Sequence, residues 1–153
     1  MKDEEVVDAV LLASRSLVAI AARSLAAAPE DVTLPQFRAL VVLATRGTQS
    51  VSALATELGT APSSATRLCD RLVRKGLVRR RESAGNRRQT DLDVTAAGRQ
   101  VVDQVTEVRR QEIARLVTAI APARRAMVVD ALNELGRAEG EVPEQPWSLG
   151  WAP

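Results

Sequence analysis

The stretch SALATELGTAPSSATRLCDRLVRKGLV, residues 52–78, holds two short helical patterns separated by a tight turn. In each pattern apolar side chains recur at steps of three and four residues, as they do on one face of a helix. Pro62 suits the first turn of the second helix, and Gly76 suits its end because glycine tolerates the left-handed backbone found there. The sequence therefore predicts helices over 52–58 and 62–75 that pack against each other.

The second of these helices has different chemistry on its two sides. One side is apolar, whereas the other starts with small polar residues and continues with arginines. A helix–turn–helix places such a helix in the major groove of DNA, where small side chains let the backbone approach the base edges. Arg67 could pair with a guanine edge, and Arg71 better suits a backbone phosphate. The predicted DNA-binding residues of this helix are Pro62, Ser63, Ser64, Thr66, Arg67 and Arg71.

The next stretch, RRRESAGNRRQTDLDVTAAG at residues 79–98, predicts a β-hairpin with arginine at its base and tip. Residues 77–78 and 92–94 have the composition of short strands, and Thr95 suits the start of another helix. Most basic runs are merely solvated, but one placed directly after a helix–turn–helix favours a wing that contacts DNA. The predicted wing residues are Arg79, Arg81, Asn86, Arg87 and Arg88.

The distribution of charge supports a nucleic-acid partner. The 153-residue chain has a formal net charge of only +2. Between residues 67 and 99, however, ten basic residues stand against four acidic ones, so this segment carries +6 and the remainder −4. Positive charge focused on one part of an otherwise ordinary protein is the footprint expected of a DNA-binding face.

The composition also argues against several other classes of protein. The chain has no histidine and no tyrosine, so the commonest general base and metal ligand are missing, and it has no glycine-rich phosphate loop. We therefore expect no metal, no cofactor and no enzymatic activity. A single cysteine, Cys69, fits a reducing compartment, and neither a signal peptide nor a membrane span is evident. These observations predict a cytoplasmic protein.

Amphipathic helices flank the central region. Apolar stripes predict helices over 3–27 and 34–47 before it, and over 95–120 and from 121 onward after it. A long amphipathic helix at each end of a small domain needs a partner surface, and a second copy of the chain is the simplest partner. The predicted fold is mainly α with a small β-hairpin: an N-terminal dimerisation helix (1–32), a winged helix-turn-helix domain (33–98), C-terminal dimerisation helices (99–139) and an irregular tail (140–153).

The combined pattern resembles the MarR family of bacterial transcriptional regulators. The resemblance is carried by LPQFRALVVLA, SALATELG, SSATRLCDRLVRKGLVRR and GNRRQTDLDVTAAG, and with the flanking helices it covers about residues 3–138. It implies a homodimer that places one recognition helix per subunit in successive major grooves of a pseudo-palindromic operator. It also implies that a tip arginine, Arg88 or else Arg87, enters the minor groove and that Asp70 orients it. The sequence departs from the family where Asn86 replaces an aspartate.

The resemblance further implies a repressor of nearby genes that is relieved by a small-molecule effector. The expected ligand cleft would be lined by Ser14, Arg15, Leu17, Phe37 and Leu40. Two other interpretations stay open at this point. One is a winged helix used only as a protein-interaction module, and the other is an alkyl-transfer enzyme that uses Cys69. The second needs an exposed, activated thiolate, whereas Cys69 falls on the apolar side of its helix.

Overall fold

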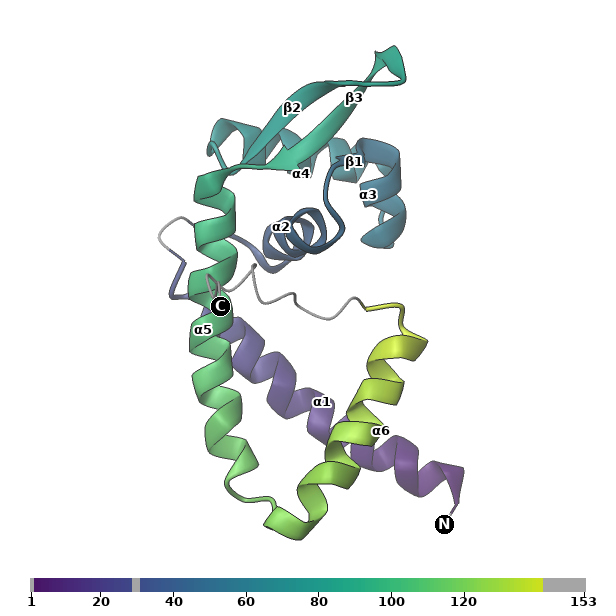
Figure 1. Cartoon of the computed structure of the whole chain (residues 1–153), viewed down its shortest axis with the longest axis vertical. Coiled ribbons are helices and arrows are strands. Elements are labelled where there is room, and N and C mark those ends of the chain that lie inside the picture. The colour runs from purple at the N-terminus through teal and green to yellow at the C-terminus, as the bar shows by residue number, and fades with distance from the viewer. Residues whose placement is uncertain (1, 29–30, 142–153) are drawn as a thin grey trace.

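Helices and one small sheet make up the part of the chain that the computed structural model describes, residues 2–28 and 31–141 without the side chains of 86–89. Figure 1 shows their arrangement, with the sheet and α4 at one end of the molecule and α1 and α6 at the other. The elements are α1 (Asp3–Leu25), α2 (Leu34–Arg46), β1 (Gln49–Ser50), α3 (Val51–Glu57), α4 (Pro62–Arg74), β2 (Val78–Ser83), β3 (Asn86–Val94), α5 (Ala96–Val117), the 3-10 turn η1 (Pro122–Arg124) and α6 (Arg125–Ala138).

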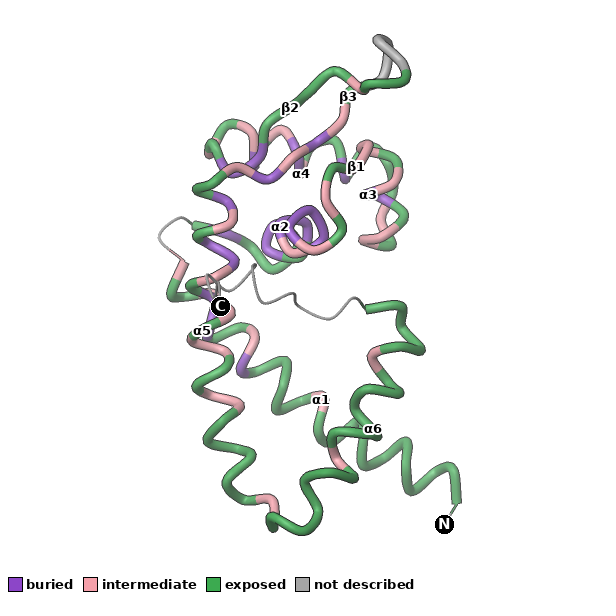
Figure 2. The backbone as a smooth tube through the Cα atoms, viewed as in Figure 1, coloured by how far each residue is buried: buried purple, intermediate pink, exposed green. Residues whose placement is uncertain are grey.

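Helix α2 runs through the centre of the winged-helix part. It begins with a capping box, in which the amide of Gln36 donates to the hydroxyl of Thr33 and the Thr33 amide donates to the side chain of Gln36 at 3.2 Å. It ends at Gly47, whose positive φ of 81° suits glycine. Both ends confirm the sequence prediction. Leu40 and Leu43 of this helix are fully buried, and Figure 2 shows the buried residues gathered around it.

The hairpin is longer than the sequence predicted and belongs to a three-stranded antiparallel sheet. The strand order is β1-β3-β2, and Val78 lies opposite Val94 while Arg80 lies opposite Leu92. Two-residue β1 pairs with β3. It was missed because two residues show no periodicity. The apolar residues of the hairpin, Val78, Leu92 and Val94, close the core over α4 and α5.

The flanking helices are packed on the centre near one end only. Ile20 and Ser24 are the buried residues of α1, and α6 buries none of its residues in this chain. Arg109 of α5 donates to the Ser24 hydroxyl at 3.4 Å and lies 5.3 Å from the ring centroid of Phe37, so α1, α2 and α5 meet there. Farther out, α1, α6 and the end of α5 are exposed (Figure 2).

The bounds of these helices differ slightly from the prediction. Helix α1 ends at Leu25 rather than 27, and α5 ends at Val117 rather than 120, because turns rather than helix follow both. The predicted irregular tail, 140–153, lies outside the described residues beyond Glu141. Across the described ranges, none of the helices combines the length and the hydropathy needed to span a bilayer.

Candidate nucleic-acid interface

Helix α4 buries one side and exposes the other, as predicted. Ala65, Cys69 and Leu72 are buried against the core. All six DNA-binding residues predicted on this helix are exposed: Pro62, Ser63, Ser64, Thr66, Arg67 and Arg71. Ala61 offers no side-chain cap to the first turn, so no side chain accepts a hydrogen bond from the Ser63 amide, whereas the Ser64 amide donates to the Ala61 carbonyl at 3.0 Å. Uncapped amides at a helix N-terminus bind phosphate well.

Three arginines on the exposed side of α4 have no internal ionic partner. Arg67, Arg71 and Arg74 form no ion pair with a described side chain, and they stand three or four residues apart on one face. Lys75, the next cation along, instead binds the backbone carbonyl of Asp31 and lies 3.4 Å from the Gln36 side chain. The lysine therefore ties the end of α4 to the start of α2, whereas the arginines are available to an external anion.

The base of the wing is a set of internal ion pairs that the sequence analysis did not foresee. Arg79 donates to Asp93 from Nε at 3.0 Å and from Nη2 at 2.6 Å, and Arg81 approaches the same carboxylate at 3.5 Å. The Arg79 hydrogen bond holds the pKa of Asp93 below its ordinary value, with added help from the Arg81 charge and in spite of partial burial. Arg79 and Arg81 are nevertheless about 60% exposed (60% and 58%), so their outer edges still face solvent.

Asp70 pairs with an arginine at the base of the wing, a contact that the sequence analysis did not foresee. Its carboxylate forms an ion pair with Arg80 of β2. Arg80 faces α4 because it alternates with Arg79 and Arg81 along the strand, and its side chain therefore lies on the opposite face of the sheet. The expected partner, Arg88, begins β3 with Asn86 and Arg87, and the side chains of these three residues are outside the described set. Their roles at the tip stay predictions.

The wing is fastened to α5 through a close contact at Gly98. The Thr95 amide donates to the Leu77 carbonyl at 3.1 Å, and the Thr95 hydroxyl both donates to the Gly76 carbonyl at 2.7 Å and caps Gly98 at 3.1 Å. A Cβ on Gly98 would stand 2.2 Å from the Leu77 oxygen. Only glycine fits there without moving the backbone. The sequence signal was a glycine in the first turn of a helix, a position where glycine has no intrinsic advantage.

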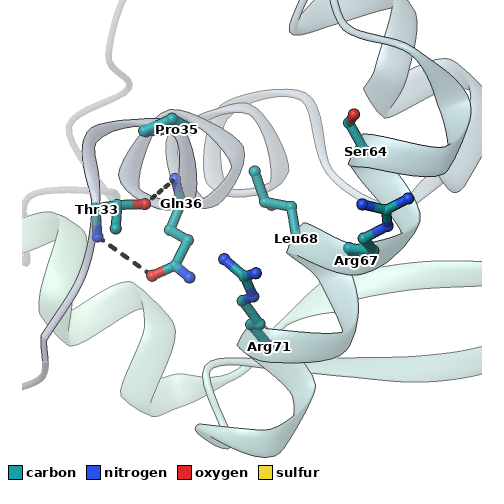
Figure 3. A pocket seen from close by; sticks show the side chains of 7 residues that line it. All are labelled: Thr33, Pro35, Gln36, Ser64, Arg67, Leu68 and Arg71. Carbon is teal, nitrogen blue, oxygen red and sulfur yellow. Dashed lines mark hydrogen bonds between the residues drawn. The ribbon is translucent and has the colours of Figure 1, made fainter.

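A hollow of about 580 Å³ lies behind the recognition helix, between α2 and α4. Its lining is mostly apolar, with one cation, and consists of Leu34, Pro35, Arg38, Leu58, Thr60, Ser64 and Leu68. A neighbouring hollow of about 240 Å³ shares three of these residues and is bordered by Arg67 and Arg71, as Figure 3 shows. Leu68 points from α4 toward α2 in the same view.

The predicted ligand-cleft residues differ in exposure in this chain, and the cleft stays a prediction. Phe37 and Leu40 are buried in the core, 3% and 0% exposed, whereas Arg15 and Leu17 lie exposed on α1 and Ser14 is half-buried there. Hydrophobic periodicity identified Phe37 and Leu40 as inward-facing, but it could not distinguish a packed core from the wall of a cleft.

Cys69 is fully buried, and burial raises the pKa of its thiol. A thiol in that state is a poor nucleophile, which argues against alkyl transfer. Among the described residues no group of histidine, cysteine or acidic side chains is arranged to hold a metal ion.

Comparison with known proteins places the chain in a family. The model described as MarR family matches residues 32–90. The uncharacterized HTH-type transcriptional regulator YfiV of Bacillus subtilis (strain 168) is 30% identical over 108 residues, which cover 71% of this chain and 68% of that protein. The transcriptional repressor MprA of Escherichia coli (strain K12) is 29% identical over 103 residues, which cover 66% of this chain and 56% of MprA.

A solved structure extends the similarity to nearly the whole chain. The crystal structure of RV1404 from Mycobacterium tuberculosis is 45% identical in sequence and superposes with a TM-score of 0.86. The match covers 95% of this chain and 99% of that one, so it includes the flanking helices as well as the winged helix. The recognition helix, the wing and the flanking helices thus recur together, and this chain belongs to the MarR family of DNA-binding transcriptional regulators.

Proposed function

We propose that this regulator acts as a homodimeric repressor. Helix α4 recognises the bases of a pseudo-palindromic operator, and the wing contacts the neighbouring minor groove. The observation that carries the proposal is the exposed side of α4, where small polar residues precede three arginines that form no ion pair with any described side chain. Base edges are read by side chains near the start of such a helix, and phosphates are bound by cations farther along it. A repressing role is supported by the relative MprA, which is named a repressor.

Individual residues take distinct roles in this proposal. Ser63, Ser64 and Thr66 lie close to the bases, and Arg67 pairs with a guanine edge. Arg71 and Arg74 bind backbone phosphates on either side of the groove. In the wing, Arg79 and Arg81 add positive charge at the base, and the tip enters the neighbouring minor groove through Arg87 and Arg88, aided by Asn86.

Dimerisation is supported by the apolar surface that one chain leaves uncovered. Exposed large apolar side chains occur on α1, on the end of α5 and along α6, and contiguous exposure of this kind marks an interaction site. They are Val6, Val7, Val10, Leu11, Leu12, Leu17, Val18, Leu116, Val117, Met127, Val129, Leu132 and Leu135. We assign residues 1–32 and 99–139 to dimerisation and 33–98 to DNA binding. Two-fold symmetry then predicts half-sites centred about 10 bp apart.

The hollow behind α4 is the place where we expect a small-molecule effector to act. It is about 580 Å³ in volume, mostly apolar, and directly touches Ser64 and Leu68 of the recognition helix. A molecule bound there would change how α4 lies on α2, and so would alter operator affinity. We propose a cytoplasmic location and no enzymatic activity, in keeping with a regulator whose partner is chromosomal DNA.

The test is selection of bound DNA from random sequence, followed by affinity measurements on single variants. Arg67→Ala should relax the preference for one base pair and cost about 1–3 kcal/mol on the best site. Arg71→Ala should weaken binding to all sequences and reduce the slope of log K against log salt by about one. Arg124→Ala, an exposed arginine in the turn η1, is the matched control and should change neither.

Two outcomes would refute this assignment. Selection that yields no enriched motif would remove sequence-specific regulation. A double variant of Arg87 and Arg88 to alanine that binds DNA as tightly as wild type would remove the wing from the interface. Together those results would leave a protein-interaction module as the better explanation of the winged helix.

A further inference from the structure

Two arginines of α2 bind the residues that follow the C-terminus of α6. Arg46 donates from Nη2 to the carbonyl of Gly140 at 2.6 Å, and Arg38 forms an ion pair with Glu141. Arg46 also lies 3.3 Å from the carboxylate of Glu57 in α3. One guanidinium therefore joins α2, α3 and the end of α6.

The end of α6 has a backbone geometry that presents these two groups to α2. Gly140 adopts a φ of +71°, its amide donates to the Arg137 carbonyl at 3.0 Å, and the Glu141 amide donates to the Gly136 carbonyl at 3.0 Å. This pair of bonds around a left-handed glycine is a Schellman motif. It fixes the direction in which the chain leaves the helix, so the Gly140 carbonyl and the Glu141 side chain are held toward Arg46 and Arg38.

Among the described residues, the start of α6 is the other place where the helix is hydrogen-bonded to its own chain, through Arg125 and the Ile120 carbonyl at 3.2 Å. None of its residues is buried, and its connection to α5 runs through the short turn η1. Figure 1 shows α6 diverging from α5 and returning toward the side of α2 and α3. The Arg38 and Glu141 side chains are 44% and 45% exposed, so their pair adds little to stability. The pair does restrict the angle between α6 and the winged-helix part.

That angle matters if α6 carries the dimer surface. Met127, Val129, Leu132 and Leu135 are exposed on α6, and a partner subunit that packs on them follows any rotation of the helix. We infer that Arg38 and Arg46 are positioning residues, which together with Gly140 and Glu141 form a latch between α6 and the DNA-binding part. The latch sets the separation of the two recognition helices. This inference rests on the proposed dimeric, DNA-binding function.

The first test measures selectivity for the spacing of half-sites. The full-length dimer would be tested on its selected operator and on versions with one or two base pairs added or removed between the half-sites. Wild type should bind each operator of altered spacing at least about tenfold more weakly than the selected operator, a loss like that caused by a mismatched base pair. Glu141→Gln and Arg38→Gln should reduce that discrimination to about threefold, and the double exchange Arg38→Glu with Glu141→Arg should restore it.

Glu139→Gln is the matched control, because Glu139 is an acid at the same helix end that makes no ion pair with a described side chain. It should keep the discrimination of wild type. Latch variants that fold, dimerise and discriminate spacings as wild type does would overturn the inference. Gly140→Ala provides a second perturbation that removes no charge: the new Cβ meets no atom within 4 Å, but the backbone φ is unfavourable for alanine.

A second measurement needs no operator, so it separates failure of the latch from failure of the proposed function. Spin labels at Thr48→Cys and Glu134→Cys, in a Cys69→Ala background and diluted with unlabelled chains, would report the distance between the winged-helix part and α6. A narrow distribution in wild type that broadens in Glu141→Gln supports the latch. Equal widths in the two proteins refute it, whether or not an operator has been found.

Discussion

Replacing Gly98 by alanine tests how the wing is attached to α5. Gly98 lies in the first turn of α5, where exchange of glycine for alanine ordinarily stabilises a helix by up to about 1 kcal/mol. Here an added Cβ would stand 2.2 Å from the Leu77 oxygen and 2.7 Å from the Val94 Cγ2 atom. Because the Leu77 oxygen is a backbone atom just before β2 and the Val94 atom lies in β3, the backbone at Leu77 and the side chain of Val94 must move away from α5.

The geometry indicates the size of the effect. Ordinary contact begins at 3.4 Å, so the Leu77 carbonyl must retreat by roughly 1 Å in an interior that is closely packed. Overpacking of this kind costs about 1–3 kcal/mol. The move also strains the bond from the Thr95 amide to that carbonyl, 3.1 Å long, and such a bond contributes about 1 kcal/mol. After the helix gain is subtracted, Gly98→Ala should lower the free energy of unfolding by about 1–3 kcal/mol.

The assay is urea unfolding of the whole chain, followed by far-ultraviolet circular dichroism at one fixed protomer concentration because a dimer's stability depends on concentration. Gly85→Ala in the wing turn is the control, since its Cβ would meet nothing within 4 Å and its φ is not positive. That variant should match wild type. If Gly98→Ala proved as stable as wild type or more so, the close approach of α5 to Leu77 would be refuted.

Three further perturbations follow from the same contacts. Asp93→Asn should lower the free energy of unfolding by about 1 kcal/mol at pH 7. Because the native pKa of Asp93 is lowered, this loss of stability should be constant above the ordinary aspartate pKa and should vanish as the pH falls through the lowered native pKa. Urea midpoints of the variant and wild type across this pH range would show it. Thr33→Ala removes the capping box of α2 and should lower the free energy of unfolding by about 1 kcal/mol; an unchanged urea midpoint would contradict the capping geometry. Cys69 is buried with a raised pKa, so a thiol reagent should label it far more slowly in native protein than in urea, and fast native labelling would reopen the alkyl-transfer alternative.

Local signals predicted the elements that local chemistry determines. The caps at Thr33 and Gly47 and the start of α4 at Pro62 follow from residues within a few positions of one another, and all are found where the sequence predicted them. Helix α4 ends at Arg74, one residue before the predicted end. The short strand β1 and the contact at Gly98 depend on segments that are far apart in the chain. A periodic pattern of apolar residues cannot predict such contacts. Gly98 meets Leu77 across 21 positions, a pairing that exists only after the hairpin has folded back.

The candidate interface was predictable in its residues but not in its internal pairing. Exposure of the polar side of α4 follows from helical periodicity, and the structure agrees for every residue predicted there. The partner of Asp70 depends instead on which face of β2 each arginine occupies. Strand alternation puts Arg80 over α4 and Arg79 on the other face with Asp93. That alternation could have been applied to the sequence once the strand register was known.

Internal pairing changes what the basic residues can do at DNA. Ten of them lie between residues 67 and 99, yet Lys75 and the three consecutive arginines of β2 already have partners within the chain. A cation that must leave an internal carboxylate to meet a phosphate gains less than one that faces only water, because the broken pair offsets part of the new one. The described arginines of α4, Arg67, Arg71 and Arg74, incur no such loss. Arg71 and Arg74, the proposed phosphate contacts, should therefore contribute more to the salt dependence of binding than the wing base. The wing base should contribute chiefly by holding the hairpin at a fixed angle to the recognition helix.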